Sequence, residues 1–204
     1  MEFACLGWPP DAPTLRLDYR RFAYAGKFVL GSTGKAVVRD GAADDGEFDD
    51  WVLAAASFSA DRTDADRLVV RYVTVRENRR GEGLGPRLLA FVADRADDRG
   101  YDRVRIAVNN PVAYRAAHRA GFAFTGAETG LAELVCERPA ARPADRPTDR
   151  YRDGLARYRD RDLGDGMAAR LADWLDGEPP PVVDPPADAD DGSGSRRADR
   201  EPGR

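Results

Sequence analysis

VTVRENRRGEGLG, residues 73–85, is the stretch that decides the expected fold, because it joins a strand pattern to a helix pattern through a glycine-rich turn. The residues before it, from Arg67 onward, are mostly β-branched and predict a strand that ends near Arg76. A helix is expected over residues 83–99, with a glycine directly after it. A helix N-terminus offers free backbone N–H groups and partial positive charge, so the turn predicts a phosphate site.

The composition of this turn narrows the kind of phosphate ligand. Glycines at 81, 83 and 85 let the backbone approach an anion without side-chain clashes, and Pro86 suits the first helical turn. A Walker loop needs Gly-Lys-Ser/Thr, whereas here Arg87 follows the proline. The dinucleotide fingerprint needs glycine where Pro86 stands. The sequence therefore argues against both of these common nucleotide motifs.

The surrounding pattern predicts an α/β (α+β) fold. Strands are expected over residues 51–60, 67–76, 102–108, 122–125 and 131–138, with helices over 83–99 and 111–120. This order predicts a sheet with helices packed on it. Nearer the N-terminus, residues 22–30 and 35–39 are interpreted as a hairpin around the Gly-Ser-Thr-Gly turn at 31–34.

The chain is expected to divide into a domain over residues 1–138 and three shorter segments. Prolines at 139, 143 and 147 predict an irregular, solvated linker over 139–162. Residues 163–177 predict an amphipathic helix whose apolar stripe docks on the domain or on a second copy of the chain, which leaves a homodimer open. Residues 178–204, rich in Pro, Asp and Gly, are expected to be disordered.

Composition excludes several classes of protein. Of 204 residues, 33% are charged, and the net charge of −4 gives no bulk positive field for nucleic acid. In the arginine-rich residues 139–204, aspartates nearly cancel the arginines, which disfavours a nucleic-acid role there as well. No apolar run is long enough for a bilayer and no signal peptide is recognised, so a cytoplasmic protein is expected. One histidine and two distant cysteines predict neither a metal site nor a disulfide framework.

Two motifs then carry a resemblance to a known family. Arg80-Gly-Glu-Gly83-Leu-Gly85 fits the pattern Arg/Gln-x-x-Gly-x-Gly/Ala, and Asn110-x-x-Ala113 precedes a Gly-Phe pair at residues 121–122. Together they resemble the acetyl-CoA signature of the GNAT-type N-acetyltransferases, over about residues 51–139. The resemblance implies a GNAT-like mixed central sheet of six to seven strands flanked by helices, with two splayed parallel strands at the cofactor site.

The resemblance also implies which residues hold the cosubstrate acetyl-CoA. Its pantetheine arm would pair with the backbone of Val73 and Val75, and the Val75 amide would polarise the thioester carbonyl. Arg80 would buttress the turn or face the phosphates, and the Asn110 side chain would hydrogen-bond the cofactor. The pyrophosphate would rest on the main-chain amides of Gly81, Glu82, Gly83, Leu84 and Gly85.

The sequence departs from the family where proton transfer is concerned. The family's usual acid, a tyrosine, is replaced by Ala117. Tyr114, one helical turn earlier, is the remaining candidate acid, with core packing as the competing interpretation. His118 is expected to be a surface histidine. Glu133, on a late strand, is the candidate base, with an exposed strand carboxylate as the competing interpretation.

These features predict an acyl-CoA N-acyltransferase. It would transfer an acetyl group from acetyl-CoA, by direct attack, to a primary amine of a small molecule or a peptide. The replaced tyrosine and the missing base leave a second hypothesis, a non-catalytic CoA-binding or regulatory module that keeps the glycine turn. The acceptor is not encoded in any motif of the sequence.

Overall fold

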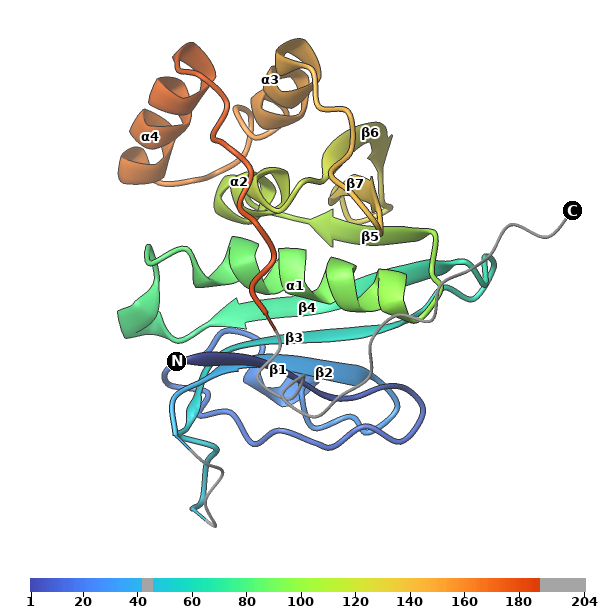
Figure 1. Cartoon of the computed structure of the whole chain (residues 1–204). Coiled ribbons are helices and arrows are strands. Elements are labelled where there is room, and N and C mark those ends of the chain that lie inside the picture. Colours follow the sequence, from blue (N-terminus) through green and yellow to red (C-terminus); the bar gives the residue numbers. More distant parts are fainter. Residues whose placement is uncertain (42–45, 188–204) are drawn as a thin grey trace, which may run out of the picture.

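The computed structural model describes residues 1–41 and 46–187. Within these residues seven strands form one mixed sheet in the order β1-β2-β3-β4-β5-β7-β6 (Figure 1). The strands are β1 Glu2–Gly7, β2 Gly34–Arg39, β3 Val52–Ala60, β4 Arg67–Val75, β5 Arg103–Val108, β6 Ala123–Glu128 and β7 Leu134–Pro139. Neighbours pair antiparallel except β4 and β5, which run parallel. The predicted mixed α/β sheet is confirmed.

Four α-helices accompany the sheet in the described part of the chain. They are α1 Leu84–Asp98, α2 Pro111–Arg119, α3 Thr148–Ala156 and α4 Asp165–Asp176, with short 3-10 helices at Ala25–Lys27 and Glu77–Arg79. The first two lie within a few residues of their predicted bounds. No described helix is long and apolar enough to cross a membrane.

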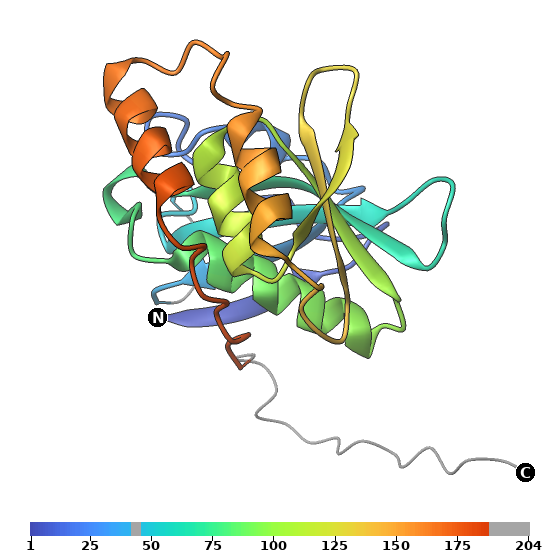
Figure 2. The ribbon, with the colours of Figure 1, turned by 90° about the horizontal axis from the view of Figure 1, so that it is seen from above.

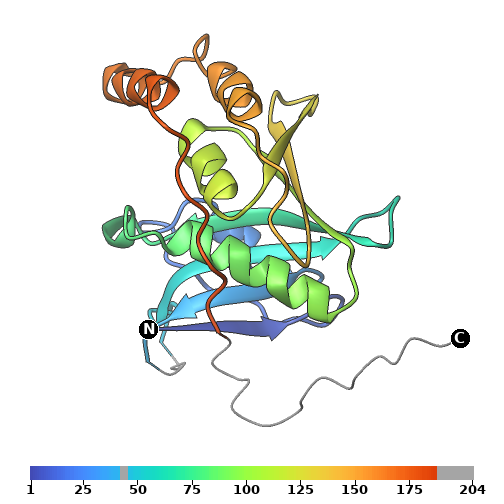
Figure 3. The same ribbon diagram turned by 45° about the horizontal axis from the view of Figure 1, so that its top comes forward.

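Two apolar clusters cover the two faces of the sheet. On one face α1 packs along β1 to β5 (Figure 3). Its side chains Leu88, Leu89 and Phe91 have no exposed surface. On the other face the chain between β1 and β2 packs Leu15 and Phe28 against the sheet. Each face of the central strands is therefore buried, which explains their near-continuous apolar sequence.

The predicted hairpin near the N-terminus is wrong. β2 forms, but its partners are β1 and β3, and the regular structure of residues 22–30 is the 3-10 helix Ala25–Lys27. The apolar residues of this stretch are used to cover a sheet face and do not form a ladder. Lys35 fixes the turn before β2, because its fully buried Nζ donates to the carbonyls of Leu30 and Thr33, each at 2.7 Å. Burial lowers the pKa of Lys35.

The predicted irregular linker over residues 139–162 is also wrong in part. α3 forms within it, and Tyr151, Leu155 and Tyr158 are buried between this helix and the rest of the domain. The prolines stop regular structure only where they stand, and Pro147 occupies the N-cap position of α3, where proline costs no helix hydrogen bond. Figure 2 shows α3 lying beside α2.

The expected C-terminal helix is confirmed as α4. Its residues Leu171 and Leu175 are buried, so the apolar stripe docks on the chain's own domain. The segment after α4 runs down past α2 and α1 (Figures 1 and 3), and the Val183 N–H donates to the Arg119 carbonyl at 2.8 Å. The start of the expected disordered tail is thus held against α2, whereas residues 188–204 lie outside the described residues.

Candidate active site

The parallel strands β4 and β5 separate at one end of the sheet. Their pairing begins at Arg67 with Arg103 and ends at Val70 with Ile106. β4 nevertheless continues for five more residues, to Val75. The end of β4 therefore has a neighbour on the β3 side and none within the sheet on the β5 side, which confirms the expected splay.

The backbone N–H groups of Val73 and Val75 point into this opening. Val75 lies opposite Ala54 of β3, and the next N–H, that of Arg76, donates to the Leu53 carbonyl at 2.9 Å. Val75 therefore belongs to a non-hydrogen-bonded pair of the antiparallel ladder, in which N–H and C=O point away from the partner strand. Val73, two residues earlier in the same register, has the same orientation. An extended ligand can pair with both residues as an added strand does.

The glycine turn leads from β4 into α1. Gly81 and Gly83 have φ values of +91° and +78°, a region that side-chain-bearing residues rarely adopt. Gly83 is the N-cap residue, and the N–H of Arg87 makes the first helical bond to its carbonyl. The helix therefore leaves the N–H groups of Leu84 and Gly85 free for an anion.

A cavity of about 360 Å³ opens at this turn, and we call it the arginine cavity. It is lined by Val75, Arg79, Arg80, Gly81, Gly83, Leu84, Gly85, Pro86, Val112, Arg115, Ala116, Arg119, Arg170 and Trp174. Five of these residues are arginines and none is a carboxylate. Arg79 is paired with Glu82 at 2.8 Å, but the described residues give the other four arginines no ion pair.

A second, smaller cavity of about 120 Å³ lies on the other side of the splay, and we call it the Glu133 cavity. It is lined by Tyr24, Arg71, Tyr72, Val73, Ile106, Ala107, Val108, Asn109, Asn110, Ala113 and Glu133. Among these described residues Glu133 is the one carboxylate. It accepts a hydrogen bond from the Thr129 hydroxyl at 3.2 Å.

The two cavities are neighbours along β4 and α2. Val75 lines the arginine cavity and Val73 lines the Glu133 cavity. On α2, Val112 faces the first cavity and Ala113 the second. A ligand that follows β4 through the splay would therefore reach from the glycine turn to the Glu133 carboxylate.

A larger cavity elsewhere has a different character. It measures about 820 Å³ and lies between β6 and α3. Three carboxylates and three arginines line it, namely Glu128, Asp153, Asp160, Arg150, Arg157 and Arg161. Its charges balance and it does not touch β4 or the glycine turn, so the site is assigned to the two cavities at the splay.

Asn110 has a clear structural role at the start of α2. Its Oδ1 accepts the N–H of Ala113 at 2.8 Å, and its Nδ2 donates to Asn109 at 3.0 Å. This is an N-cap, which satisfies one free donor of the helix. The residue lines the Glu133 cavity, so its expected contact with the cofactor remains a prediction.

Tyr114 lies outside both cavities. It is 2% exposed, and its hydroxyl donates to the Tyr151 carbonyl at 3.1 Å. α3 can pack this closely because Gly154 has no side chain to meet the phenol ring. Burial strongly raises the pKa of Tyr114. The geometry thus favours the core-packing interpretation over the proposed proton donor.

The expectation of a surface histidine at residue 118 is wrong. His118 is 5% exposed, and its ring lies 4.3 Å from the ring centre of Tyr151 on α3. Burial, followed by the charges of Arg146 and Arg115, lowers the pKa of His118 to about 4. The imidazole is therefore neutral near pH 7 and belongs to the helix packing.

Among the residues of the arginine cavity that sequence reasoning missed are Arg115 and Arg119 of α2 and Arg170 and Trp174 of α4. The sequence contained a weak signal for them: Arg115 and Arg119 are four residues apart, as are Arg170 and Trp174, so each pair shares one face of its helix. Nothing in the spacing showed that α4 returns to α2 and places both pairs at the glycine turn. The missing information was the path of the chain through α3.

Comparison with known families identifies the family of the chain. Residues 3–122 match the sequence model described as the acetyltransferase (GNAT) family, and this match spans more than half of the chain. The chain belongs to the GNAT acetyltransferase family. The resemblance carried by the two motifs is confirmed. Within this GNAT chain, α3 and α4 lie outside the matched residues.

Solved structures give more distant similarities. Nourseothricin acetyltransferase is 23% identical, covers 53% of this chain and 65% of its own, and gives a TM-score of 0.43. A GCN5-related N-acetyltransferase from Kribbella flavida is 25% identical, with coverages of 52% and 67% and a TM-score of 0.42. The GNAT chain described here therefore spans just under two thirds of the first of these. A search of curated proteins finds no match.

Proposed function

We propose that the chain is an N-acetyltransferase that moves an acetyl group from acetyl-CoA to a primary amine. One observation carries the proposal. The free edge of β4, with two inward N–H groups, joins a cavity with an excess of arginines to a cavity with a carboxylate. The arrangement suits a long cosubstrate with phosphates at one end and a reactive thioester at the other.

The residues at the splay fit the parts of acetyl-CoA in order. The glycine turn and α1 N-terminus offer backbone donors to the diphosphate. The edge of β4 offers hydrogen bonds to the amide groups of the pantetheine arm. Since Val73 lines the Glu133 cavity and Val75 the arginine cavity, the geometry favours the Val73 amide, in place of the expected Val75 amide, as donor to the thioester carbonyl.

The chemistry needs few groups from the protein. The amine nitrogen attacks the carbonyl carbon, the carbon–sulfur bond breaks, and the thiolate leaves with the electron pair. Glu133, which lines the same cavity as Val73, would accept the proton that the attacking nitrogen loses. The family's usual acid is absent, because Ala117 stands in its place, and the nearby Tyr114 is buried outside both cavities. The leaving thiolate then takes its proton from solvent.

Two measurements test the proposal. Calorimetry with acetyl-CoA should show binding at roughly micromolar to submillimolar concentration. An assay against pooled amines, polyamines and peptides should show thiol release that depends on the amine. An absence of binding to both acetyl-CoA and CoA would overturn the assignment. Binding without turnover on a broad amine panel would favour the alternative, a CoA-binding module, for which the lost tyrosine is the motivating observation.

A single substitution tests the role of the carboxylate. Glu133→Gln should lower kcat about 100-fold while leaving the affinity for acetyl-CoA unchanged, because general base catalysis contributes that much or more. Glu128→Gln is the matched control, since Glu128 lies near Glu133 in the β6–β7 hairpin but outside the Glu133 cavity. Equal kcat values for the two variants would exclude Glu133 as the base.

A further inference from the structure

The helix α4 returns to the glycine turn although it lies about 80 residues further along the chain. Arg170 and Trp174 line the arginine cavity together with residues of α1 and α2. The position of α4 is fixed by buried Leu171 and Leu175, and Arg152 of α3 donates to the carbonyl of Gly177 at 3.2 Å. The C-terminal helix is therefore a built wall of this cavity.

The indole ring of Trp174 gathers two guanidinium groups at the cavity. The Arg115 guanidinium lies 4.4 Å from the ring centre and that of Arg170 lies 4.9 Å from it. Such cation–π contacts orient the two cations and leave their charge available. Arg115 also donates to the neutral hydroxyl of Tyr151 at 3.1 Å, which fixes its direction without neutralising it.

Arg119 brings a third unpaired charge to the same place. A Cβ atom built on Gly83 would lie 3.9 Å from Arg119 Nη2, so this guanidinium stands beside the N-cap of α1. The carbonyl of Arg119 accepts the Val183 N–H, which ties the segment after α4 to the same turn of α2. In the described structure no carboxylate pairs with Arg115, Arg119 or Arg170.

This concentration of charge is unfavourable without a ligand. Like charges in proximity repel, and the positive end of the α1 dipole adds to them. The chain as a whole has a net charge of −4, so the excess is local and does not reflect general basicity. A polyanion with more than one phosphate would neutralise several of these charges at once.

We infer that Arg119 of α2 and Arg170 of α4, the latter oriented by Trp174, bind the phosphate groups of the acyl-CoA, so that the C-terminal helix completes the nucleotide end of the site. The inference rests on the proposed function. It assigns a ligand-binding role to α4, which lies outside the residues that match the family. Arginine suits this role because its guanidinium donates two parallel hydrogen bonds to phosphate oxygens.

Calorimetry on the full chain tests the inference. Arg170→Gln and Arg119→Gln should each lower the affinity for acetyl-CoA about tenfold at low salt, because a hydrogen bond to a charged group is lost. Both variants should also show a weaker dependence of affinity on salt. Arg62→Gln is the control, since it removes the same charge from the exposed turn between β3 and β4 and should leave the affinity unchanged.

The second part of the experiment measures the binding of S-acetylpantetheine, which lacks the nucleotide phosphates. Its affinity should be the same for the full chain and for both arginine variants, which would show that their pantetheine site is intact. Unchanged affinity and salt dependence for acetyl-CoA in both variants would overturn the inference, while binding by the parent chain would leave the proposed function standing. Equal weakening of both ligands would also overturn it, because the substitutions would then act on the fold. Failure of the parent chain to bind acetyl-CoA would instead overturn the proposed function.

Discussion

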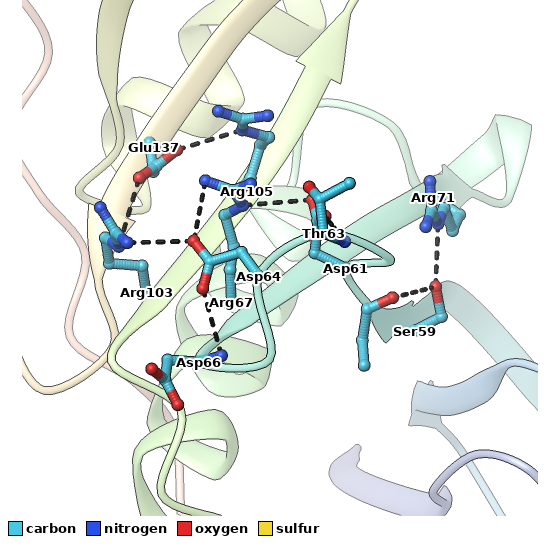
Figure 4. Close-up of polar contacts among 11 residues, drawn as sticks. Ser59, Asp61, Thr63, Asp64, Asp66, Arg67, Arg71, Arg103, Arg105 and Glu137 are labelled. Atoms are coloured by element: carbon cyan, nitrogen blue, oxygen red, sulfur yellow. Dashed lines mark hydrogen bonds and ion pairs between the residues drawn. The ribbon is translucent and has the colours of Figure 1, made fainter.

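The two ends of the β4–β5 strand pair differ in whether their arginines have carboxylate partners. At the end where the strands are paired, arginines and carboxylates alternate in a salt-bridge cluster (Figure 4). Its members are Asp61, Asp64, Arg67, Arg103, Arg105 and Glu137, with N–O distances between 3.0 and 3.7 Å. At the end where the strands diverge, four of the five arginines of the cavity have no carboxylate partner among the described residues.

This difference separates structural charge from functional charge. In the salt-bridge cluster each arginine is matched within the fold, and the N–H and hydroxyl of Thr63, with the Arg67 guanidinium, hold the pKa of Asp61 well below its usual value. In the arginine cavity, a bound ligand would supply the negative charge that pairs with the arginines. The number of arginines therefore does not predict where phosphate binds in this chain. What predicts it is whether each arginine has a carboxylate partner within the fold.

The largest effect on acetyl-CoA binding is expected from placing a negative charge in the arginine cavity. Gly83→Asp should weaken acetyl-CoA binding at least about 100-fold, because a like charge near 4 Å costs a few kcal/mol at an effective dielectric of 20. Gly83→Asn is the matched control, since asparagine has the same size and tolerates the positive φ about as well. Calorimetry on both variants separates charge from backbone strain. Equal losses would show that strain, and not an anion site, explains the effect.

The burial of His118 on α2, together with the charges of Arg146 and Arg115, should also appear in the pH dependence of stability. His118 has a pKa of about 4 in the fold against about 6.5 in the unfolded chain. Between these values the unfolded state binds more protons, so the free energy of unfolding should fall as the pH drops from about 6.5 to about 4, by on the order of 2 kcal/mol. Denaturant titrations at several pH values measure this loss.

His118→Leu should flatten that part of the pH profile, because it removes the titrating ring and keeps an apolar side chain beside Tyr151. Carboxylates such as Asp61 titrate at lower pH and should contribute equally in both proteins. A slope unchanged by the substitution would show that His118 is accessible to protons in the folded state.

Substitutions in the salt-bridge cluster, at the paired end of β4 and β5, should lower the stability of the fold without changing the affinity for acetyl-CoA. Arg67→Gln leaves Asp61 and Asp64 without their shared partner, both of which are about 3.1 Å from it, and should lower the free energy of unfolding by about 1 to 2 kcal/mol. Its affinity for acetyl-CoA should stay that of the parent chain. Arg119→Gln should show the reverse pattern, so the two variants form a crossed pair. A loss of acetyl-CoA affinity in Arg67→Gln would break the distinction between the two ends.

The smallest effect concerns the buried phenol behind the site. Tyr114→Phe should leave kcat within about twofold, because its hydroxyl lies in neither cavity, and should cost about 1 kcal/mol of stability for the lost hydrogen bond to Tyr151. Turnover assays and urea titrations give the two values. A fall in kcat of tenfold or more would restore Tyr114 as a candidate acid.

Much of the central domain could be predicted because its signals are local. The β-branched run of β4, the glycines at 81 and 83 and the apolar spacing of α1 each state a backbone preference that needs no distant partner. The two motifs added the family. The prediction of an N-terminal hairpin was wrong because the sequence of an apolar segment does not show whether the segment joins a sheet or covers one. The linker failed because three prolines outweighed the apolar residues of α3.

The candidate site divides in the same way. The glycine turn and the residues of the β4 edge were identified from local pattern, and the structure gives them free N–H groups that face one opening. Tyr114 and His118 were placed on a helix correctly but judged without α3, which buries both. The arginines of α2 and α4 were missed, because their meeting depends on contacts between segments more than 50 residues apart.

The sequence by itself determined that a strand, a glycine turn and a helix follow one another, because each depends on the backbone preferences of adjacent residues. Tertiary structure alone decided which arginines are neutralised and which remain open to a ligand. Charge compensation depends on distance in space, and the folding of α3 and α4 onto α2 sets those distances.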